Sequence, residues 1–456
     1  MSRPKGFLTL LIPAAAAVAA VAQVSAPAGP VSPPPVAQKT APQRQIVTVA
    51  PPAPDDRIRA AAEALSPKLV ELRRDLHMHP ELGNRETRTG ALVAERLRAL
   101  GIEVRYPVAR TGVIAVLRGG RPGRTAALRA DIDALPIEER NAVPYKSLNP
   151  GVKHACGHDA HTTIVLGTAE VLAKMRARLP GTVVFIFQPA EEGPPDGEEG
   201  GAPLMVKEGV LDNPKVGAIF GLHMDATLDV GQVGWSVGPI FASSDRFVIT
   251  VMGKKVHGAY PHMGLDPVPV AAEMVQAMQL IVSRQIDAQN PKVLTIGSIH
   301  GGNRFNIIAD QVTMEGTMRT LDATVRKEMK ERLKRTVDGV AAAHGTTATL
   351  RFVDEGNDVT VNDAALTRAS VGSLERVYGA ARVLEVKPQM GAEDFASFAA
   401  RVPALYIKMG MRNEAKGITA MIHTEDFDID EAVLPLGVRA MSTLVWDYLA
   451  RTGRRP

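Results

Sequence analysis

The sequence predicts an α/β fold in which a largely parallel-sheet main domain is interrupted by an inserted ferredoxin-like (βαββαβ) domain. Two observations lead to this prediction. Short apolar runs alternate with helical stretches near both ends of the folded part, a pattern typical of a parallel sheet covered by helices. In the middle, about a hundred residues follow the order strand, helix, two strands, helix and strand, which is the ferredoxin-like unit.

The N-terminal half of the main domain carries four apolar stretches at helical spacing and four short apolar runs. Gly101 is placed to end the second helix. We expect helices at 55–76, 86–100, 161–175 and 202–210, and strands at 111–117, 125–130, 182–187 and 218–222.

The same apolar periodicity predicts the elements of the middle and of the C-terminal part. A Gly-Gly-Asn loop at 301–303 separates the two central strands of the inserted unit. We expect that unit to comprise strands at 246–252, 292–299, 311–318 and 346–353, and helices at 267–284 and 324–343. The C-terminal part should add helices at 362–378, 393–400 and 431–450 and a strand at 404–408.

The N-terminus predicts export rather than fold. Arg3 and Lys5 precede an apolar run at 7–21, and small residues follow, as in a secretory signal peptide at 1–26. A membrane anchor is the alternative, but Pro13 and the shortness of the run disfavour it. Residues 27–54 are rich in Pro and Ala with almost no charge, which predicts a disordered linker. The protein should therefore be periplasmic or secreted, with no membrane span after signal cleavage.

The composition argues against a nucleic-acid partner and against an intrachain disulfide bond. The formal charge of +4 is small for 456 residues and aromatic residues make up 4%, so no nucleic-acid partner is expected. The single cysteine, Cys156, excludes an intrachain disulfide bond.

The densest chemical signal lies at 154–161, where three of the eleven histidines and the only cysteine fall within eight residues. Cys156 and His158 are two residues apart, so a thiolate and an imidazole can face one point, and both suit a borderline divalent ion. A satisfied buried histidine at a helix start is the alternative for any one of them. For the cluster as a whole, metal binding is favoured.

Further polar residues follow three other predicted strands. Asp131 and Asp133 come after one strand, Glu191 and Glu192 after the next, and His223 after a third. Ligands of open α/β sheets bind outside the carboxyl ends of the strands, so these side chains should converge there. His423 follows the last strand and could close the site, although a lone histidine is usually structural.

A competing signature is the G-x-S-x-G match at 234–238, which contains Ser236. A nucleophile elbow needs a strand before the serine and a helix directly after it. Pro239 and a further strand follow here, so a serine hydrolase is disfavoured.

Nine short sequence blocks, which include the histidine and carboxylate motifs above, resemble those of the metal-dependent aminoacylase and carboxypeptidase family. The resemblance is closest to the branch of hippurate hydrolases and plant auxin–amino acid conjugate hydrolases. The blocks lie in family order over nearly the whole folded part, at 73–83, 129–136, 154–161, 188–193, 221–223, 253–267, 306–319, 390–395 and 423–431.

The resemblance implies a role for each matching residue. The five matches to metal ligands are Cys156, His158, Glu192, His223 and His423. Glu191 matches the general base, Asp131 a carboxylate that supports the metal centre, and His257 a histidine that polarises the scissile carbonyl. Asn306 and Arg319 match residues that grip the free carboxylate of the substrate. Lys255 and Val256 depart from the glycines usual in relatives, which leaves the turn before His257 open.

The resemblance also implies the activity and the domain roles. We expect hydrolysis of small N-acyl or N-aroyl amino acids with two divalent metal ions, Mn or Zn before Co or Ni. The expected domains are a catalytic domain at 55–240 and 356–456 and a lid and dimerisation domain at 241–355. A homodimer is implied because in many relatives the lid histidine comes from the partner subunit.

Three alternatives to this function remain. A dipeptidase or carboxypeptidase of the same family would use the same ligand set. A metal-loaded binding protein without catalysis is disfavoured because the set includes Glu191, the match to the base. A serine hydrolase would need Ser236 and would resist chelators.

Overall fold

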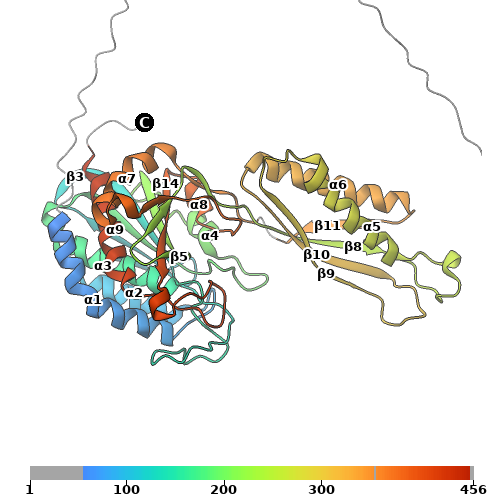
Figure 1. Ribbon diagram of the computed structural model, residues 1–456, viewed down its shortest axis with the longest axis horizontal. Coiled ribbons are helices and arrows are strands. Elements are labelled where there is room, and N and C mark those ends of the chain that lie inside the picture. The colour runs from blue at the N-terminus through green and yellow to red at the C-terminus, as the bar shows by residue number, and fades with distance from the viewer. Residues whose placement is uncertain (1–54, 354–355, 452–456) are drawn as a thin grey trace, which may run out of the picture. The chain divides into compact units, whose positions relative to one another are not determined.

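The computed structural model describes residues 55–353 and 356–451. The expected signal peptide and Pro-rich linker lie outside the described residues. The described part of the chain contains one large sheet with helices on its faces and a second sheet packed against α5 (Pro267–Leu280) and α6 (Ala323–Ala343) (Figure 1). None of the helices in this part has both the length and the apolar character of a membrane-spanning helix.

The large sheet has eight strands in the order β1-β2-β4-β3-β5-β14-β6-β13. Their bounds are β1 Glu103–Val108, β2 Gly112–Arg118, β3 Arg121–Asp131, β4 Pro180–Gln188, β5 Ala218–Asp229, β6 Val233–Trp235, β13 Val383–Glu385 and β14 Ala404–Arg412. The four central strands β4, β3, β5 and β14 are parallel. The β1–β2, β2–β4 and β14–β6 pairs are antiparallel, so the sheet is mixed, and the predicted parallel pairing holds for its four central strands and for the edge pair β6–β13.

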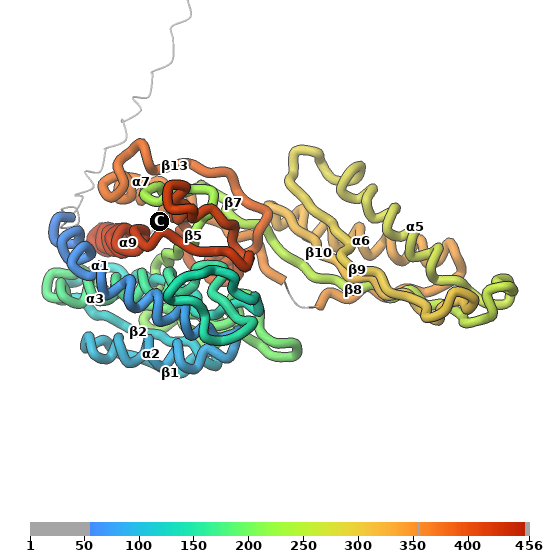
Figure 2. The backbone as a smooth tube through the Cα atoms, turned by 60° about the horizontal axis from the view of Figure 1, so that its bottom comes forward, coloured from blue at the N-terminus to red at the C-terminus, as the bar shows by residue number. Residues whose placement is uncertain are grey.

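The central strands are buried on both faces because their apolar residues alternate between two cores. In β4, Val183 and Phe185 belong to one core and Val184 and Ile186 to the other. The first core is covered by helices from both ends of the chain, and Figure 2 shows α9 beside α1 and α3. These helices are α1 Asp55–Met78, α2 Thr87–Ala99, α3 His158–Lys174, α7 Ala364–Tyr378 and α9 Val433–Ala450. The second core packs under α4 Gly201–Lys207 and α8 Ala396–Ala399.

The second sheet carries the element order that the sequence predicts for the inserted unit. Its strands lie in the order β11-β8-β10-β9, with every neighbouring pair antiparallel. Their bounds are β8 Asp245–Met252, β9 Lys292–Gly301, β10 Gln311–Thr320 and β11 Ala348–Phe352. Alternate residues of β8 are buried, and they pack with α5 and α6 in a third core that is separate from the two cores of the large sheet.

Several elements differ from those expected. The helix expected at 393–400 is reduced to the single turn α8, because Glu393 and Asp394 are drawn into buried ionic contacts with Arg129. Helix α5 ends at Leu280 and continues as a π-helical turn, Ile281–Gln285. Strand β1 and the short strands β6, β13, β7 (Gly238–Phe241) and β12 (Thr360–Asn362) were not expected. The strands β6, β7, β12 and β13 are three or four residues long and pair with strands distant in sequence, and β1 alternates only weakly, so the apolar pattern of the sequence does not reveal them.

Candidate metal centre

The loop before α3 aims Cys156 and His158 at the same point. Gly157 lies between them with a φ of +94°, a left-handed conformation that glycine adopts without steric cost. A Cβ at this position would also lie only 2.7 Å from Cγ of Met224 on β5. Helix α3 begins at His158 itself, three residues earlier than expected. Gly157 therefore allows the loop to pass close to β5 and present both side chains to it.

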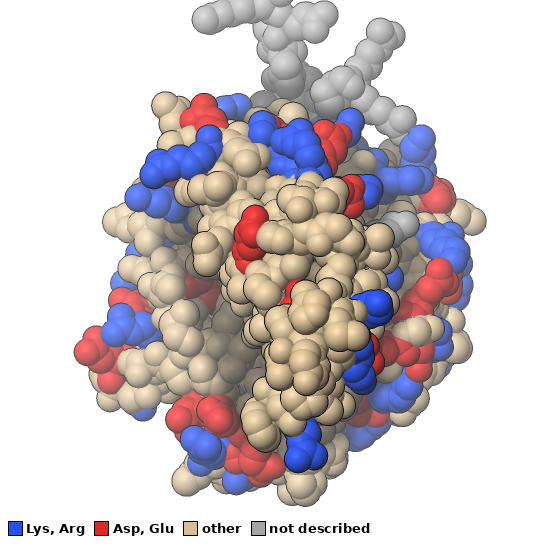
Figure 3. Space-filling model, turned by 90° about the vertical axis from the view of Figure 1, so that its right-hand side faces the viewer, with Lys and Arg blue, Asp and Glu red and all other residues tan. Residues whose placement is uncertain are grey.

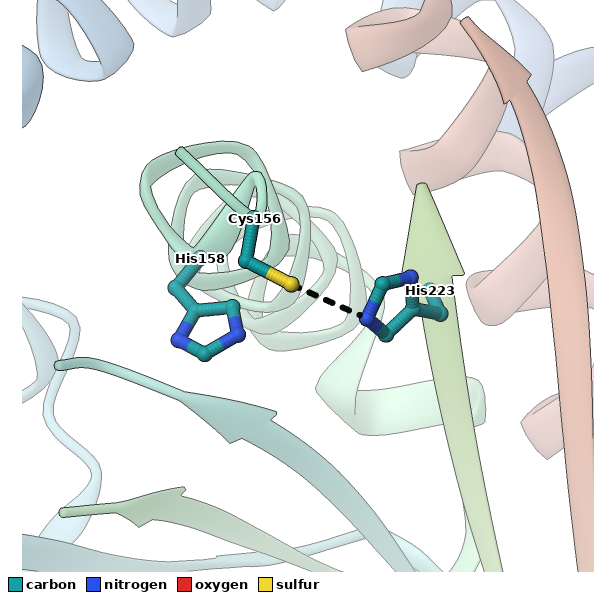
Figure 4. A group of neighbouring side chains, drawn as sticks. All are labelled: Cys156, His158 and His223. Atoms are coloured by element: carbon teal, nitrogen blue, oxygen red, sulfur yellow. Dashed lines mark hydrogen bonds between the residues drawn. The ribbon is translucent and has the colours of Figure 1, made fainter. Parts of the chain in front are cut away.

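Strand β5 supplies the third side chain of this group. His223 lies within β5, which continues to Asp229 rather than ending at Leu222 as expected. Its Nε2 is 3.4 Å from Sγ of Cys156 (Figure 4). One ligand atom each of Cys156, His158 and His223 lies within 4.8 Å of the others, and all three residues are buried.

Two further groups connect the remaining predicted ligands to this one. Cys156 groups with Glu192 and His423, and His158 groups with Glu191 and Glu192, again within 4.8 Å. Nε2 of His423 is 3.3 Å from Sγ of Cys156 and 3.0 Å from Oε1 of Glu192. The structure thus brings together all five residues that the sequence predicts as metal ligands, with Glu191 beside them.

Hydrogen bonds fix the imidazole rings with one nitrogen facing the cluster. Nδ1 of His158 lies 2.9 Å from the carbonyl oxygen of Asp133, and Nδ1 of His223 lies 2.7 Å from that of Met224. Each Nδ1–H donates to its carbonyl, so each Nε2 keeps a lone pair for a ligand. Nε2 of His158 is buried and has no hydrogen-bond partner among the described residues. An unpaired buried nitrogen facing a thiol and carboxylates fits a divalent cation.

His161, by contrast, has both of its ring nitrogens occupied. Nδ1 lies 2.6 Å from Oδ1 of Asp131, and Nε2 accepts a hydrogen bond from the backbone N–H of Met224 at 2.9 Å. His161 therefore fixes Asp131 and β5 rather than offering a lone pair. Asp131 itself is fully buried, and its Oδ2 lies 3.8 Å from Nε2 of His158.

The electrostatics of the cluster also favour a cation. Burial raises the pKa of the Glu191 carboxyl well above its usual value, and Glu393 and Glu192 raise it further. Burial, Glu192 and Glu191 likewise raise the pKa of the Cys156 thiol. A bound cation would relieve this crowding of acidic groups and favour the thiolate.

Behind these residues lies an ionic network that the sequence analysis did not assign. The buried guanidinium of Arg129 donates hydrogen bonds to Asp131, to Glu393 at 2.8 Å and to Asp394 at 3.0 Å. Oxygen atoms of Glu191, Glu393 and Asp394 lie within 4.8 Å of one another. Arg129 and Glu393 fall inside the blocks at 129–136 and 390–395, but no local pattern reveals that they meet.

A pocket of about 430 Å³ opens beside the cluster. Cys156, Glu191, Glu192, His223 and His423 line one part of it, and Arg319 at the end of β10 lines another. Nη1 of Arg319 donates to the carbonyl oxygen of Met390 at 3.2 Å. Burial lowers the pKa of Arg319, and no carboxylate in the described part of the chain counters that effect. Arg319 therefore offers an unpaired half-buried guanidinium to an anion in the pocket.

The structure does not bring the other two predicted substrate-contacting residues into this pocket. His257 is exposed and forms an isolated β-bridge with Ile307. Asn306 lies close to it, because the backbone N–H of Gly258 donates a hydrogen bond to the Asn306 carbonyl. Neither residue lines the pocket. Lys255 and Val256 lie in an irregular segment between the β-bridges Lys254–Leu265 and His257–Ile307, and Val256 fills the space beside Gly264.

Ser236 has no catalytic environment. Its hydroxyl donates to the carbonyl oxygen of Pro239 at 3.1 Å, and it does not line the pocket. The expectation that Ser236 is not a nucleophile agrees with this geometry.

A mixed α/β sheet with a histidine, cysteine and carboxylate cluster beside a pocket defines the class of metal-dependent hydrolases. The chain belongs to peptidase family M20/M25/M40, whose model matches residues 127–447. It is an enzyme of this hydrolase family.

Three similar proteins illustrate the family. Thermostable carboxypeptidase 2 of Saccharolobus solfataricus is 40% identical over 85% of this chain and 97% of its own length. IAA-amino acid hydrolase ILR1-like 4 of Arabidopsis thaliana is 38% identical over 84% of this chain and 86% of its own. The YXEP protein of Bacillus subtilis, a dinuclear metal-binding peptidase of family M20, is 34% identical, covers 86% of this chain and all of its own, and superimposes with a TM-score of 0.73.

Proposed function

We propose that this protein is an amidohydrolase with two divalent metal ions that cleaves N-acyl or N-aroyl amino acids into a carboxylic acid and a free amino acid. The observation that carries the proposal is a single pocket lined by Glu191, by the guanidinium of Arg319 and by four of the five cluster residues, with the buried His158 grouped beside them. Hydrolysis of an amide next to a carboxylate would use the cluster and Glu191 at the amide and the guanidinium at the carboxylate. The conjugate hydrolase among the relatives and the dinuclear centre of the solved relative support it.

Cys156, His158, Glu192, His223 and His423 would hold the two ions. Mixed sulfur, nitrogen and oxygen donors suit Zn or Mn, with Co or Ni as further candidates. Bound ions would supply the Lewis acidity that polarises an amide carbonyl and activates water. The overlap of the three groups through Cys156, His158 and Glu192 supports two ions rather than one.

Glu191 would act as the general acid–base. Its side chain is largely buried, lines the pocket and has Oε2 3.8 Å from Nε2 of His158. From this position Glu191 can accept a proton from the attacking water and return it to the leaving amine. Asp131, held by Arg129 and His161, would keep His158 and its surroundings in place.

Arg319 would bind the free carboxylate of the amino acid. A guanidinium fork can donate two parallel hydrogen bonds to a carboxylate, which fixes its orientation as well as its position. The hydrogen bond from Nη1 to the Met390 carbonyl supports this role because it holds the guanidinium against the pocket wall.

The domain at 241–355 would serve as a lid and dimerisation domain. Asn306 and His257 belong to it but lie outside the pocket, so they would reach a substrate only through lid movement or from a partner subunit. Exposed apolar side chains near them, Tyr260, Met263 and Phe305, support a contact between two copies of the chain. The face shown in Figure 3 carries few charged groups near its centre, which is compatible with such a contact.

Mixed dimers test this arrangement. In an equal mixture of His257→Ala and Glu191→Ala chains, about half of the dimers should be heterodimers, each with one intact composite site. We expect activity to return on mixing to about a quarter of the wild-type value, because half of the dimers would carry one working site of two. No recovery would contradict a histidine supplied in trans.

Export would follow from the segment at 1–26, with the linker at 27–54 as a tether, so the enzyme would act in the periplasm or outside the cell. Sequencing the N-terminus of the mature protein from its native host tests this. A chain that begins at Met1 in the cytoplasm would contradict it.

The experiment for the activity is a substrate panel on metal-analysed protein. Acetylated and benzoylated amino acids should release free amino acid after loading with Zn²⁺ or Mn²⁺. Absence of turnover for all of them, with two ions bound per chain, would reject the proposal.

Carboxypeptidase activity is the second candidate, because a relative at 40% identity bears that name. A carboxypeptidase would also use Arg319 for the terminal carboxylate. Comparing each acetyl-amino acid with the dipeptide that presents a free amine in the same place separates the two candidates.

A further inference from the structure

One lysine is buried beside the pocket and has a single carboxylate near its ammonium group among the described residues. Lys408, on β14, is 1% exposed, and its Nζ forms no hydrogen bond with a described residue. The nearest counter-charge is Oδ2 of Asp225 at 3.6 Å, and the ring centroid of Phe241 lies 4.6 Å from Nζ. A buried ammonium is costly even when it is paired, so packing alone does not account for Lys408.

Asp225 connects Lys408 to the pocket. Its Oδ1 accepts hydrogen bonds from both the backbone N–H and the hydroxyl of Thr227, and its Oδ2 accepts one from Nε2 of Gln389 at 3.2 Å. Asp225, Thr227 and Gln389 all line the pocket. We call these three residues, with Lys408 behind them, the polar wall.

The position of the polar wall indicates which part of a substrate it contacts. Asp225 lies two residues after His223 on β5, so both side chains point to the same face of the sheet. Gln389 directly precedes Met390, whose carbonyl oxygen accepts from Arg319. The wall therefore adjoins the metal-ligand cluster through β5 and the segment that holds the guanidinium through Gln389, within the same pocket. A substrate with its amide at the cluster and its carboxylate at Arg319 would turn its α-carbon and side chain toward this wall.

The charges of the wall define the side chain that fits. Asp225 and Lys408 neutralise each other, so neither an anionic nor a cationic side chain gains a net charge interaction. Gln389 donates one N–H to Asp225, which leaves its second N–H as a donor and its amide oxygen as an acceptor. An aliphatic side chain would displace the water that is hydrogen-bonded to these polar groups and would offer no hydrogen bond in its place, which costs binding free energy.

We propose that the polar wall selects amino acids with an uncharged side chain that forms hydrogen bonds, such as threonine, serine, asparagine or glutamine. In this arrangement Lys408 is a positioning residue that fixes Asp225 and, through it, Gln389. The inference rests on the proposed function, because it assumes an N-acyl amino acid bound between the cluster and Arg319.

Paired substrates of equal shape test the inference on the metal-loaded full-length enzyme. N-acetylthreonine is compared with N-acetylvaline, N-acetylglutamine with N-acetylmethionine, and N-acetylglycine is the reference without a side chain. We expect kcat/KM to be at least about 10-fold higher for the polar member of each pair. Each ratio comes from one enzyme preparation, so it does not depend on the fraction of protein that is folded.

Lys408→Met keeps the length of the side chain and removes its charge. We expect both ratios to fall to within about 2-fold of unity, because Asp225 and Gln389 are no longer fixed. The ratio of N-acetyllysine to N-acetylmethionine should rise, because Asp225 then lacks its counter-ion. Lys174→Met is the matched control, since Lys174 is exposed on α3 and pairs only with Glu170. It should retain the wild-type ratios.

Each outcome has one interpretation. Wild-type ratios near unity, or ratios that survive Lys408→Met, would overturn the polar wall while turnover of N-acetylglycine left the proposed function intact. If the metal-loaded enzyme hydrolysed none of these substrates, the proposed function and this inference would both be rejected.

Discussion

Glu191 has three acidic neighbours. Glu192 is adjacent in sequence, and carboxylate oxygens of Glu393 and Asp394 lie within 4.8 Å of one of its own. Burial raises the pKa of its carboxyl, and Glu393, Glu192 and Asp394 raise it further. Cations held by the cluster would lower its pKa again. The basicity of Glu191 is therefore expected to depend on metal loading.

Replacing Glu191 by glutamine removes the base and keeps the shape of the side chain. We expect kcat to fall by about 10²–10⁴-fold, the usual contribution of general acid–base catalysis. Metal content measured by mass spectrometry should stay near wild type, because the predicted ligands are unchanged. Glu198→Gln is the control on the same loop: Glu198 pairs with Arg85 and does not line the pocket, so activity should change little. Equal activity of the two variants would remove Glu191 from the role of base.

Arg319 gives a second prediction at the level of one side chain. Arg319→Met should lower kcat/KM for N-acyl amino acids by about 100-fold, the worth of a charge-assisted hydrogen-bond pair. The corresponding N-acyl amino acid amides, which lack the carboxylate, should be affected far less. A uniform loss on both substrate types would show that Arg319 acts through the fold rather than on the carboxylate.

At the scale of single elements, the loop before α3 decides whether the cluster can form. Gly157→Ala places a side chain at a φ of +94° and against Met224. We expect a loss of about 1–3 kcal/mol in stability from the strained backbone, together with weaker metal binding. Gly372→Ala is the matched control: Gly372 lies within helix α7 with nothing near its missing Cβ, and alanine there should stabilise the protein by up to about 1 kcal/mol. Metal titration and thermal unfolding of both variants measure these effects, and unaltered metal affinity in Gly157→Ala would contradict the role given to the loop.

Elements with a strong apolar pattern could be predicted from the sequence, and elements defined by distant contacts could not. The central strands and long helices were expected because their apolar residues repeat regularly. The edge strand β1 alternates exposed and half-buried residues, so its pattern is weak. The turn at α8 is short because Glu393 meets Arg129, a contact between residues 264 positions apart.

The residues of the candidate site also divide into those that a local sequence pattern indicates and those that only distant contacts bring to the site. Cys156 and His158 lie close in sequence, so their spacing alone indicated metal binding. His423 is isolated in sequence, so its place after the last strand was a weak indication and the family resemblance a stronger one; its Nε2 lies 3.3 Å from Sγ of Cys156. Lys408 carried no signal, because a lysine at the end of an apolar strand is normally exposed.

At the scale of the whole molecule, the C-terminal part of the main domain packs against the N-terminal part along the sheet and through α9, which lies against α1 and α3, and His423 adds a contact at the cluster. Bound cations would therefore link the two sequence halves of that domain. Chelation should lower the unfolding temperature by several degrees, because a ligand that binds only the folded state stabilises it by mass action. Adding Zn²⁺ or Mn²⁺ back should restore it. An unfolding temperature that is indifferent to chelator, in protein shown to contain metal beforehand, would contradict this coupling.

The central claim is that Cys156, His158, Glu192, His223 and His423 together hold two divalent cations. The most direct measurement is anomalous diffraction from crystals of Zn²⁺- or Mn²⁺-loaded protein. We expect two anomalous peaks about 3.5–4 Å apart, both within coordinating distance of these side chains. A single peak, or peaks held by Glu393 and Asp394 instead, would contradict it.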